Sequence, residues 1–152
     1  MHTAVQPLND LKTIQRLYQE PEFKVIAHDH RGAEPVLHPK AQYLGAYVDG
    51  ALAGLFLVIR SSALEVDLHV LILQKFIRQA RDLGRDCLNW VFADRSIQRA
   101  TAYVMEGRDS TINYTKKLGF RHEGMRRCAC SINGRLIGVH TMGLTRTDWE
   151  AA

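Results

Sequence analysis

The sequence lacks any run of apolar residues long enough to cross a membrane. Its longest run, Ala51 to Ile59, falls well short of the roughly 20 residues that a membrane-spanning helix needs. The N-terminus also lacks a basic segment followed by an apolar core, which is the pattern of a secretory leader. We therefore expect a cytoplasmic protein that contacts no membrane.

Cysteine is scarce, with 3 in the chain. Three cysteines cannot all pair, and Cys128 and Cys130 stand two apart on a predicted strand, so we expect reduced thiols. Cys-x-Cys has no second pair at ligand spacing, which disfavours zinc. The segment His28-Asp29-His30 and His38 offer ligand types that metals use, but they lack the fixed spacing of a zinc motif, and we expect no metal.

Charge and aromatic residues are also limited. The net charge is +4 and 8% of the residues are aromatic. This basic excess suits an anionic cofactor, but it is too small and too dispersed to predict nucleic-acid binding, and no aromatic residues are interleaved with it. With 152 residues, 46% hydrophobic and 24% charged, the chain has the composition of one globular domain over residues 1–152.

The first half of the chain has the pattern of one helix, one loop and three strands. The helix begins behind Asn9 or Asp10, where apolar side chains recur with a helical period, and Pro21 ends it. Residues 27–40 show no periodicity and predict an exposed loop. Strands follow at residues 41–48, 51–60 and 64–70, and the Asp49-Gly50 turn joins the first two.

Helices and strands alternate in the second half. Apolar side chains from Phe76 to Val91 recur at steps of three and four, which predicts an amphipathic helix with a basic stripe. A strand at residues 97–105, a helix at 110–118 stopped by Gly119, and a closing hairpin of strands 120–132 and 135–144 follow. This order predicts an α/β (α+β) fold, in which ligands bind beyond the strand ends near Val70 and Met105.

The most specific pattern begins with the segment from Gly107 to Arg127. It contains Lys117-Leu-Gly-Phe120 and Glu123-Gly124, and it is followed by Asn133-Gly134-Arg135 and by Leu144-Thr-Arg146 before Trp149. In this order and spacing it resembles the C-terminal half of the GNAT N-acetyltransferases, in particular the branch that acetylates protein N-termini or small amines. The resemblance implies a mixed central sheet of about six to seven strands with helices on both faces.

The resemblance also implies direct transfer of an acetyl group from acetyl-CoA, as co-substrate, to the amine of a small molecule or a protein. A general base must then take a proton from the amine. Glu65, Asp67 and His69 alternate along the predicted strand beside the cleft. His69 is the first choice, because it has a suitable unperturbed pKa and lies nearest the strand end, and Glu65 is the second. Exposure to solvent alone selects the same alternation.

In the family, a loop of pattern Gln/Arg-x-x-Gly-x-Gly/Ala opens the helix after this strand, and its backbone N–H groups hold the CoA pyrophosphate. The segment from Lys75 to Ala80 takes this place, so the resemblance implies CoA contacts at five positions: Lys75, Arg78, Gln79, Ala80 and Arg81. Arg78 stands where the first glycine is expected, so a side chain occupies space that the phosphates need. A second register, Arg81 to Asp86, keeps Arg and Gly but shortens the helix.

Two further family positions lie on the last helix. An Asn that contacts CoA corresponds to Arg108, and a Tyr that acts as general acid corresponds to Thr115. Tyr114 is one residue away, about 100° round a helix, so it can serve as the acid if the helix turns. An ordinary half-buried tyrosine is the alternative interpretation.

The missing glycines leave a second function open, a catalytically inactive GNAT-fold protein with a role in assembly or partner binding. The glycine-poor loop and residues 107–120 resemble small acetyltransferase-like proteins encoded by tailed phages, which would place that role in a virion. The two closing strands also offer a surface for a homodimer.

Overall fold

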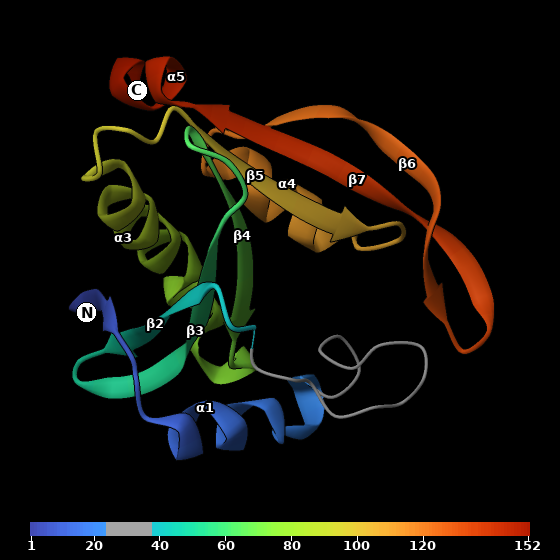
Figure 1. Ribbon diagram of the computed structural model, residues 1–152. Helices are drawn as coiled ribbons and strands as arrows, with labels where there is room; N and C mark the ends of the chain where they lie inside the picture. The colour runs from blue at the N-terminus through green and yellow to red at the C-terminus, as the bar shows by residue number, and fades with distance from the viewer. Residues whose placement is uncertain (24–37) are drawn as a thin grey trace.

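The computed structural model describes residues 1–23 and 38–152. Seven strands form one sheet in the order β1-β2-β3-β4-β5-β7-β6 (Figure 1). They span Thr3–Pro7 (β1), Ala41–Val48 (β2), Ala51–Arg60 (β3), Glu65–Ile72 (β4), Arg99–Met105 (β5), Arg121–Ile132 (β6) and Arg135–Thr145 (β7). Strands β4 and β5 run parallel, and the other neighbouring pairs are antiparallel. The predicted mixed sheet is confirmed.

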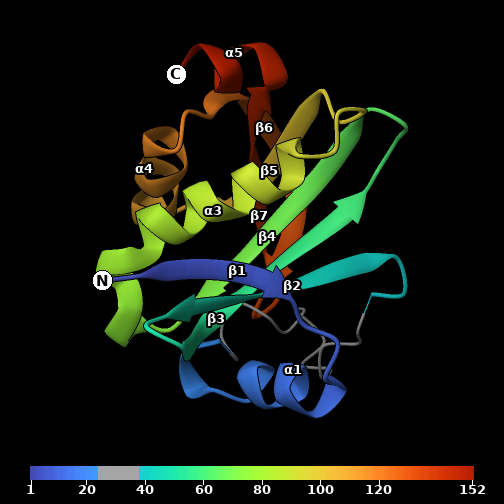
Figure 2. The same ribbon diagram turned by 90° about the vertical axis from the view of Figure 1, so that its left-hand side faces the viewer.

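Helices cover both faces of the sheet. Helix α1 (Leu11–Tyr18) lies on one face, and α3 (Ala80–Phe92) and α4 (Asp109–Lys117) lie on the other (Figure 2). A 3-10 helix, η1 (Gln74–Gln79), leads directly into α3, and α5 (Arg146–Ala151) closes the chain. In the part of the chain that the structure describes, no helix has both the length and the apolar character of a membrane span.

Two apolar cores follow from the alternation of side chains along the strands. Phe56 of β3 packs in the core beneath α3, whereas the next residue, Leu57, packs in the core beneath α1. Successive strand residues point to opposite faces, so a nearly continuous apolar strand such as β3 serves both layers. This explains why the longest apolar run of the sequence is a central strand.

Two predictions about elements need correction, and a third lies largely outside the described residues. Strand β1 and helix α5 were not predicted, because β1 is a short edge strand that backbone pairing to β2 defines, and α5 is a single short helix. The helix predicted from Phe76 becomes α-helical at Ala80, after the 3-10 segment. Of the predicted loop at 27–40, residues 27–37, with His28, Asp29 and His30, lie outside the described residues.

Candidate functional site

Strands β4 and β5 separate part-way along their length. Their pairing runs from Glu65 with Arg99 to Leu68 with Ala102. Beyond this point β4 continues to Ile72 and β5 to Met105, with no further pairing between them. Figure 1 shows the two strands diverging. The sheet therefore opens at the carboxyl ends of its parallel pair, where the sequence predicts a site.

The opening leaves backbone groups of β4 without a ladder partner. Leu64 directs its carbonyl towards β5, where it accepts from Gln98 N–H at 2.8 Å, and Leu73 N–H points the other way, to the Ala53 carbonyl at 2.9 Å. Backbone groups alternate in direction along a strand, so Val70 and Ile72 direct theirs towards β5. Such free N–H groups can bind a ligand amide or stabilise charge that develops on a carbonyl oxygen.

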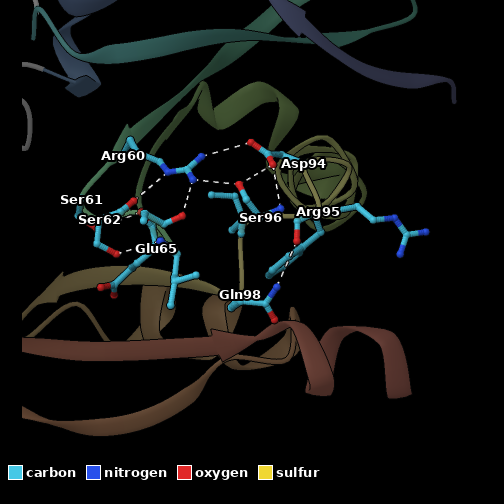
Figure 3. Close-up of polar contacts among 12 residues, drawn as sticks. Arg60, Ser61, Ser62, Glu65, Asp94, Arg95, Ser96 and Gln98 are labelled. Carbon is cyan, nitrogen blue, oxygen red and sulfur yellow. Dashed lines mark hydrogen bonds and ion pairs between the residues drawn. The ribbon is translucent and has the colours of Figure 1, made fainter.

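Arg60 holds the other end of the β4–β5 pair together (Figure 3). Its Nε donates to the Ser62 carbonyl at 2.8 Å, and its Nη2 donates to Ser96 Oγ at 2.9 Å. Its Nη1 forms an ion pair with Asp94 at 3.2 Å. These contacts tie the β3–β4 connection to the α3–β5 connection, so the strands are closed at this end and open at the other.

A charged network crosses the α1-side face of the sheet at this closed end. Arg99 Nε donates to Glu65 at 3.0 Å, and the Thr101 hydroxyl donates to the same Glu65 oxygen. Arg99 Nη1 donates to Glu123 of β6 at 2.8 Å. Gly143 of the intervening strand β7 leaves space for these side chains, because a Cβ there would collide with both Glu123 and Arg99. Glu65 is therefore engaged in a network of side chains from β4, β5 and β6 that passes over β7.

His69 lies further along β4, on the same face, at the start of the opening. The residue is exposed, but the surrounding protein removes enough water to lower its pKa from the ordinary value of 6.5. Asp67 opposes this shift and His38 adds to it. Burial and the neighbouring Glu65 raise the pKa of Asp67. A lowered pKa keeps the imidazole neutral at pH 7, which is the form that accepts a proton.

A small pocket of about 50 Å³ lies where the two strands part. His69 and Val70 of β4, Ala102 of β5, Leu88 of α3 and Leu118 at the end of α4 contribute to its lining. The wall is largely apolar, so the site combines free backbone groups with a dry surface. That combination suits the amide groups and methylenes of an extended chain.

The hydroxyl groups of α4 are engaged within the protein. Tyr114 donates to the Ala80 carbonyl of α3 at 2.9 Å, and Thr115 donates to the Thr111 carbonyl at 2.7 Å. Burial also raises the pKa of Tyr114 above its ordinary value. Both residues line the pocket, yet each has committed its one proton to a carbonyl.

The predicted phosphate-binding segment forms η1. Within and around this 3-10 helix, Phe76 N–H donates to Leu73 and Ala80 N–H donates to Ile77. The first N–H, of Gln74, donates to the Glu22 carboxylate at 2.6 Å. Several backbone donors of this segment are therefore bound within the chain.

The structure brings the predicted cofactor residues together in part. Lys75, Arg78 and Arg81 are exposed around the start of α3, with Gln79 half-buried and Ala80 buried among them. Arg108 lies on another element, at the N-terminus of α4. His69 and Tyr114 both line the pocket, from opposite faces of the sheet, whereas Glu65 lies at the closed end.

Sequence reasoning missed Arg99, Thr101 and Glu123. The alternation Arg99-Ala-Thr101-Ala-Tyr103 carries a signal, because it places three polar side chains on one face of a strand. Their partner Glu65 is identified only when the β4–β5 register is known. In the described ranges, 1–23 and 38–152, no group of three metal-ligating side chains comes together, and the three cysteines are free.

Solved structures of acetyltransferases share this fold. A chimera of spermidine N-acetyltransferase SpeG from Vibrio cholerae with hSSAT has a TM-score of 0.83 at 16% identity, over 100% of both chains. The Vibrio cholerae spermidine N-acetyltransferase in complex with CoA and spermine has a TM-score of 0.81 at 16% identity, over 97% of this chain and 98% of that one. A probable acetyltransferase gives 0.76 at 16% identity, over 97% and 95%.

At this level of identity the likeness shows the fold, which is that of the GNAT acetyltransferases. The family of this protein is identified from its sequence. The model of the family described as "Protein of unknown function (DUF2824)" matches residues 9–152, and the chain belongs to this family.

Proposed function

We propose that this protein is an acyl-CoA-dependent N-acetyltransferase that transfers an acetyl group directly from acetyl-CoA to an amine. The observation that carries the proposal is the β4–β5 opening, with the backbone groups of Val70 and Ile72 free of ladder partners. An extended acyl carrier in this opening would complete the hydrogen bonding that the sheet leaves unfinished. The acceptor is a small-molecule or protein amine.

The chemistry assigns His69 as the base. The amine nitrogen attacks the thioester carbonyl, the C–S bond breaks, and the nitrogen gives its proton to the neutral imidazole. Free β4 N–H groups stabilise the oxyanion. The thiolate takes its proton from solvent, since the Tyr114 and Thr115 protons are bound to carbonyls. Glu65 remains the second choice, and its contacts with Arg99 and Thr101 suit a positioning role.

The phosphates of the cofactor would be held mainly by side chains. Lys75, Arg78 and Arg81 supply positive charge at the start of α3, and Gln79 and Ala80 complete that turn. The 3-10 hydrogen bonds of η1 reduce the number of backbone donors available to an anion. We therefore expect weaker CoA binding than a glycine-rich loop would provide.

Titration with acetyl-CoA, followed by thermal unfolding, tests the proposal. A ligand that binds the folded state raises the Tm, and at 100 times Kd it contributes about 2.7 kcal/mol. We expect Lys75→Ala and Arg78→Ala each to weaken acetyl-CoA binding about fivefold. Arg95→Ala, an exposed arginine beyond the opposite end of α3, is the matched control and should leave binding unchanged. An unchanged Tm at millimolar acetyl-CoA would contradict the proposal.

One observation favours a second candidate, a GNAT-fold protein without acyl transfer that acts in assembly or partner binding, as in a phage virion. The segment expected to hold the pyrophosphate has Arg78 in place of a glycine and uses several of its backbone donors internally. This candidate predicts that neither acetyl-CoA nor CoA changes the Tm. The same titration therefore separates the two functions.

A further inference from the structure

Helices α3 and α4 approach closely where Tyr114 and Leu118 lie against Gly84. Gly84 of α3 makes the contact possible, because a Cβ there would lie 2.6 Å from the Tyr114 hydroxyl oxygen and 2.7 Å from Leu118 Cδ1. One turn earlier, the Ala80 carbonyl accepts the Tyr114 hydroxyl at 2.9 Å. Tyr114 thus packs against α3 and also donates a hydrogen bond to it.

Elsewhere α4 is held by apolar packing, in which the half-buried Ile112 and Leu118 lie against the core. Thr115 is its one buried residue, and its hydroxyl bonds within the helix. Among the described residues, Tyr114 forms the one side-chain hydrogen bond that joins α4 to another element. Removing that bond would therefore free α4 to move relative to α3 more than a typical surface change would.

This contact lies beside the β4–β5 opening. Tyr114 and Gly84 line the same pocket as His69 and Val70. The pocket measures about 50 Å³, whereas pockets for small ligands usually measure about 300–1,000 Å³. An acyl carrier that enters between α3 and α4 needs more room than this arrangement offers.

We propose that Tyr114 is a gate: its bond to Ala80 holds α4 against α3 in the ligand-free protein, and release of that bond widens the pocket for the acyl carrier. The identity of the carrier rests on the proposed function, but the gate does not. Tyr114 is then a positioning residue and not the acid of the reaction. The raised pKa of its hydroxyl keeps it protonated, and therefore able to donate, throughout the physiological range.

Cys87 offers a direct readout of the gate. Its side chain is 1% exposed and lines the same pocket, so a thiol reagent reaches it only when the pocket opens. Substituting Cys128→Ser and Cys130→Ser leaves Cys87 as the one thiol in the chain. In this background, the rate of reaction with an aromatic disulfide reagent measures how often the pocket is open.

We expect Tyr114→Phe to raise the Cys87 labelling rate about threefold to tenfold, the range that corresponds to one lost hydrogen bond. Tyr47→Phe is the matched control, because Tyr47 is a half-buried tyrosine on β2, and it should leave the rate unchanged. The increase should persist in low denaturant without growing, since local opening exposes little additional surface.

Equal labelling rates in Tyr114→Phe and the parent would overturn the gate. So would an increase that rises with denaturant in parallel with global unfolding. As a second variant, Gly84→Ala displaces Tyr114 without removing its hydroxyl and should raise the rate in the same direction. Acetyl-CoA tests the proposed function separately: faster labelling in Tyr114→Phe without protection of Cys87 by acetyl-CoA would support the gate and contradict acetyl-CoA binding.

Discussion

Arg99 shows how one side chain can organise several strands. It stands on β5 and reaches Glu65 on one side and Glu123 on the other. The guanidinium can cross β7 because Gly143 has no side chain in its way. Glu65 is held by this pairing, and the neighbouring Arg99 lowers the pKa of Glu123 below its ordinary value.

Gly143→Ala should destabilise the protein, because the new Cβ would meet the Arg99–Glu123 pair. We expect a loss of about 1–3 kcal/mol in the free energy of unfolding, measured by urea denaturation. Gly138→Ala on the same strand is the control. Its Cβ would meet the end of the flexible Met125 side chain, which can move aside, so the loss should be smaller. Equal losses would argue against the crossing network as the cause.

Asp67 and His69 should be coupled in their titration. Asp67 raises the pKa of His69 against the stronger effect of desolvation, so Asp67→Asn should lower the His69 pKa further below 6.5. NMR titration of the ring protons measures this shift. Asp82→Asn, an exposed carboxylate on α3, is the control. An unchanged His69 pKa in the Asp67 variant would show that the two side chains are not coupled.

The same shift fixes the direction of a pH effect on stability. In the folded protein the pKa of His69 is lower than its value of 6.5 in the unfolded chain. As the pH falls below 6.5, the unfolded chain therefore binds more protons than the folded protein. The stability contributed by neutral His69 is therefore complete above 6.5 and is lost as the pH falls towards the folded pKa. Urea denaturation between about pH 7.5 and about pH 5.5 should show this loss, and His69→Gln should reduce it.

Periodicity identified the ionisable face of β4 but could not identify its partners. Glu65 and His69 share a face because strand residues alternate, and this can be read directly from the sequence. Arg99 lies on another strand after a crossover helix, so its distance from Glu65 depends on the register of a non-local pair. Sequence reasoning therefore found the candidate base but not the network that engages its neighbour.

Among the elements, the two connections at the closed end of β4–β5 act together through Arg60. Arg60→Ala should lower the free energy of unfolding by about 1 kcal/mol, because several charge-assisted bonds at a partly exposed site are lost. Amide hydrogen exchange should show the largest loss of protection at the paired segment of β4 and β5. Arg95→Ala, in the same connection, should change neither measurement. Uniform loss of protection across the sheet would contradict this local role.

Strand β6 forms one edge of the sheet and is interrupted twice. Its register with β7 shifts between His122 and Gly124 and again between Arg126 and Cys130. Within the second interruption, Cys128 has a positive φ of 52°, which few side chains adopt. Bulges of this kind twist an edge strand away from further pairing. The hairpin was predicted from Asn133-Gly134, whereas neither bulge has a sequence signal of comparable strength.

At the scale of the whole molecule, strand order was the least accessible property. The sequence predicted a helix between β4 and β5 and a closing hairpin, and both are confirmed. It did not predict that β7 rather than β6 joins β5, because either strand of a hairpin can take the inner position. The seven-stranded arrangement also needed β1, which is only five residues long and ends in proline, so its sequence carries little strand signal.

The point where β4 and β5 part is fixed by the fold. Leu68 and Ala102 form the last pair, and Arg60 fixes the strands at the far end. An extended ligand that enters the β4–β5 opening therefore stops at a constant depth, whatever group it carries at its end. If the protein transfers acyl groups as proposed, the distance from that stop to His69 would select thioesters by length, because it sets which carbonyl reaches the imidazole.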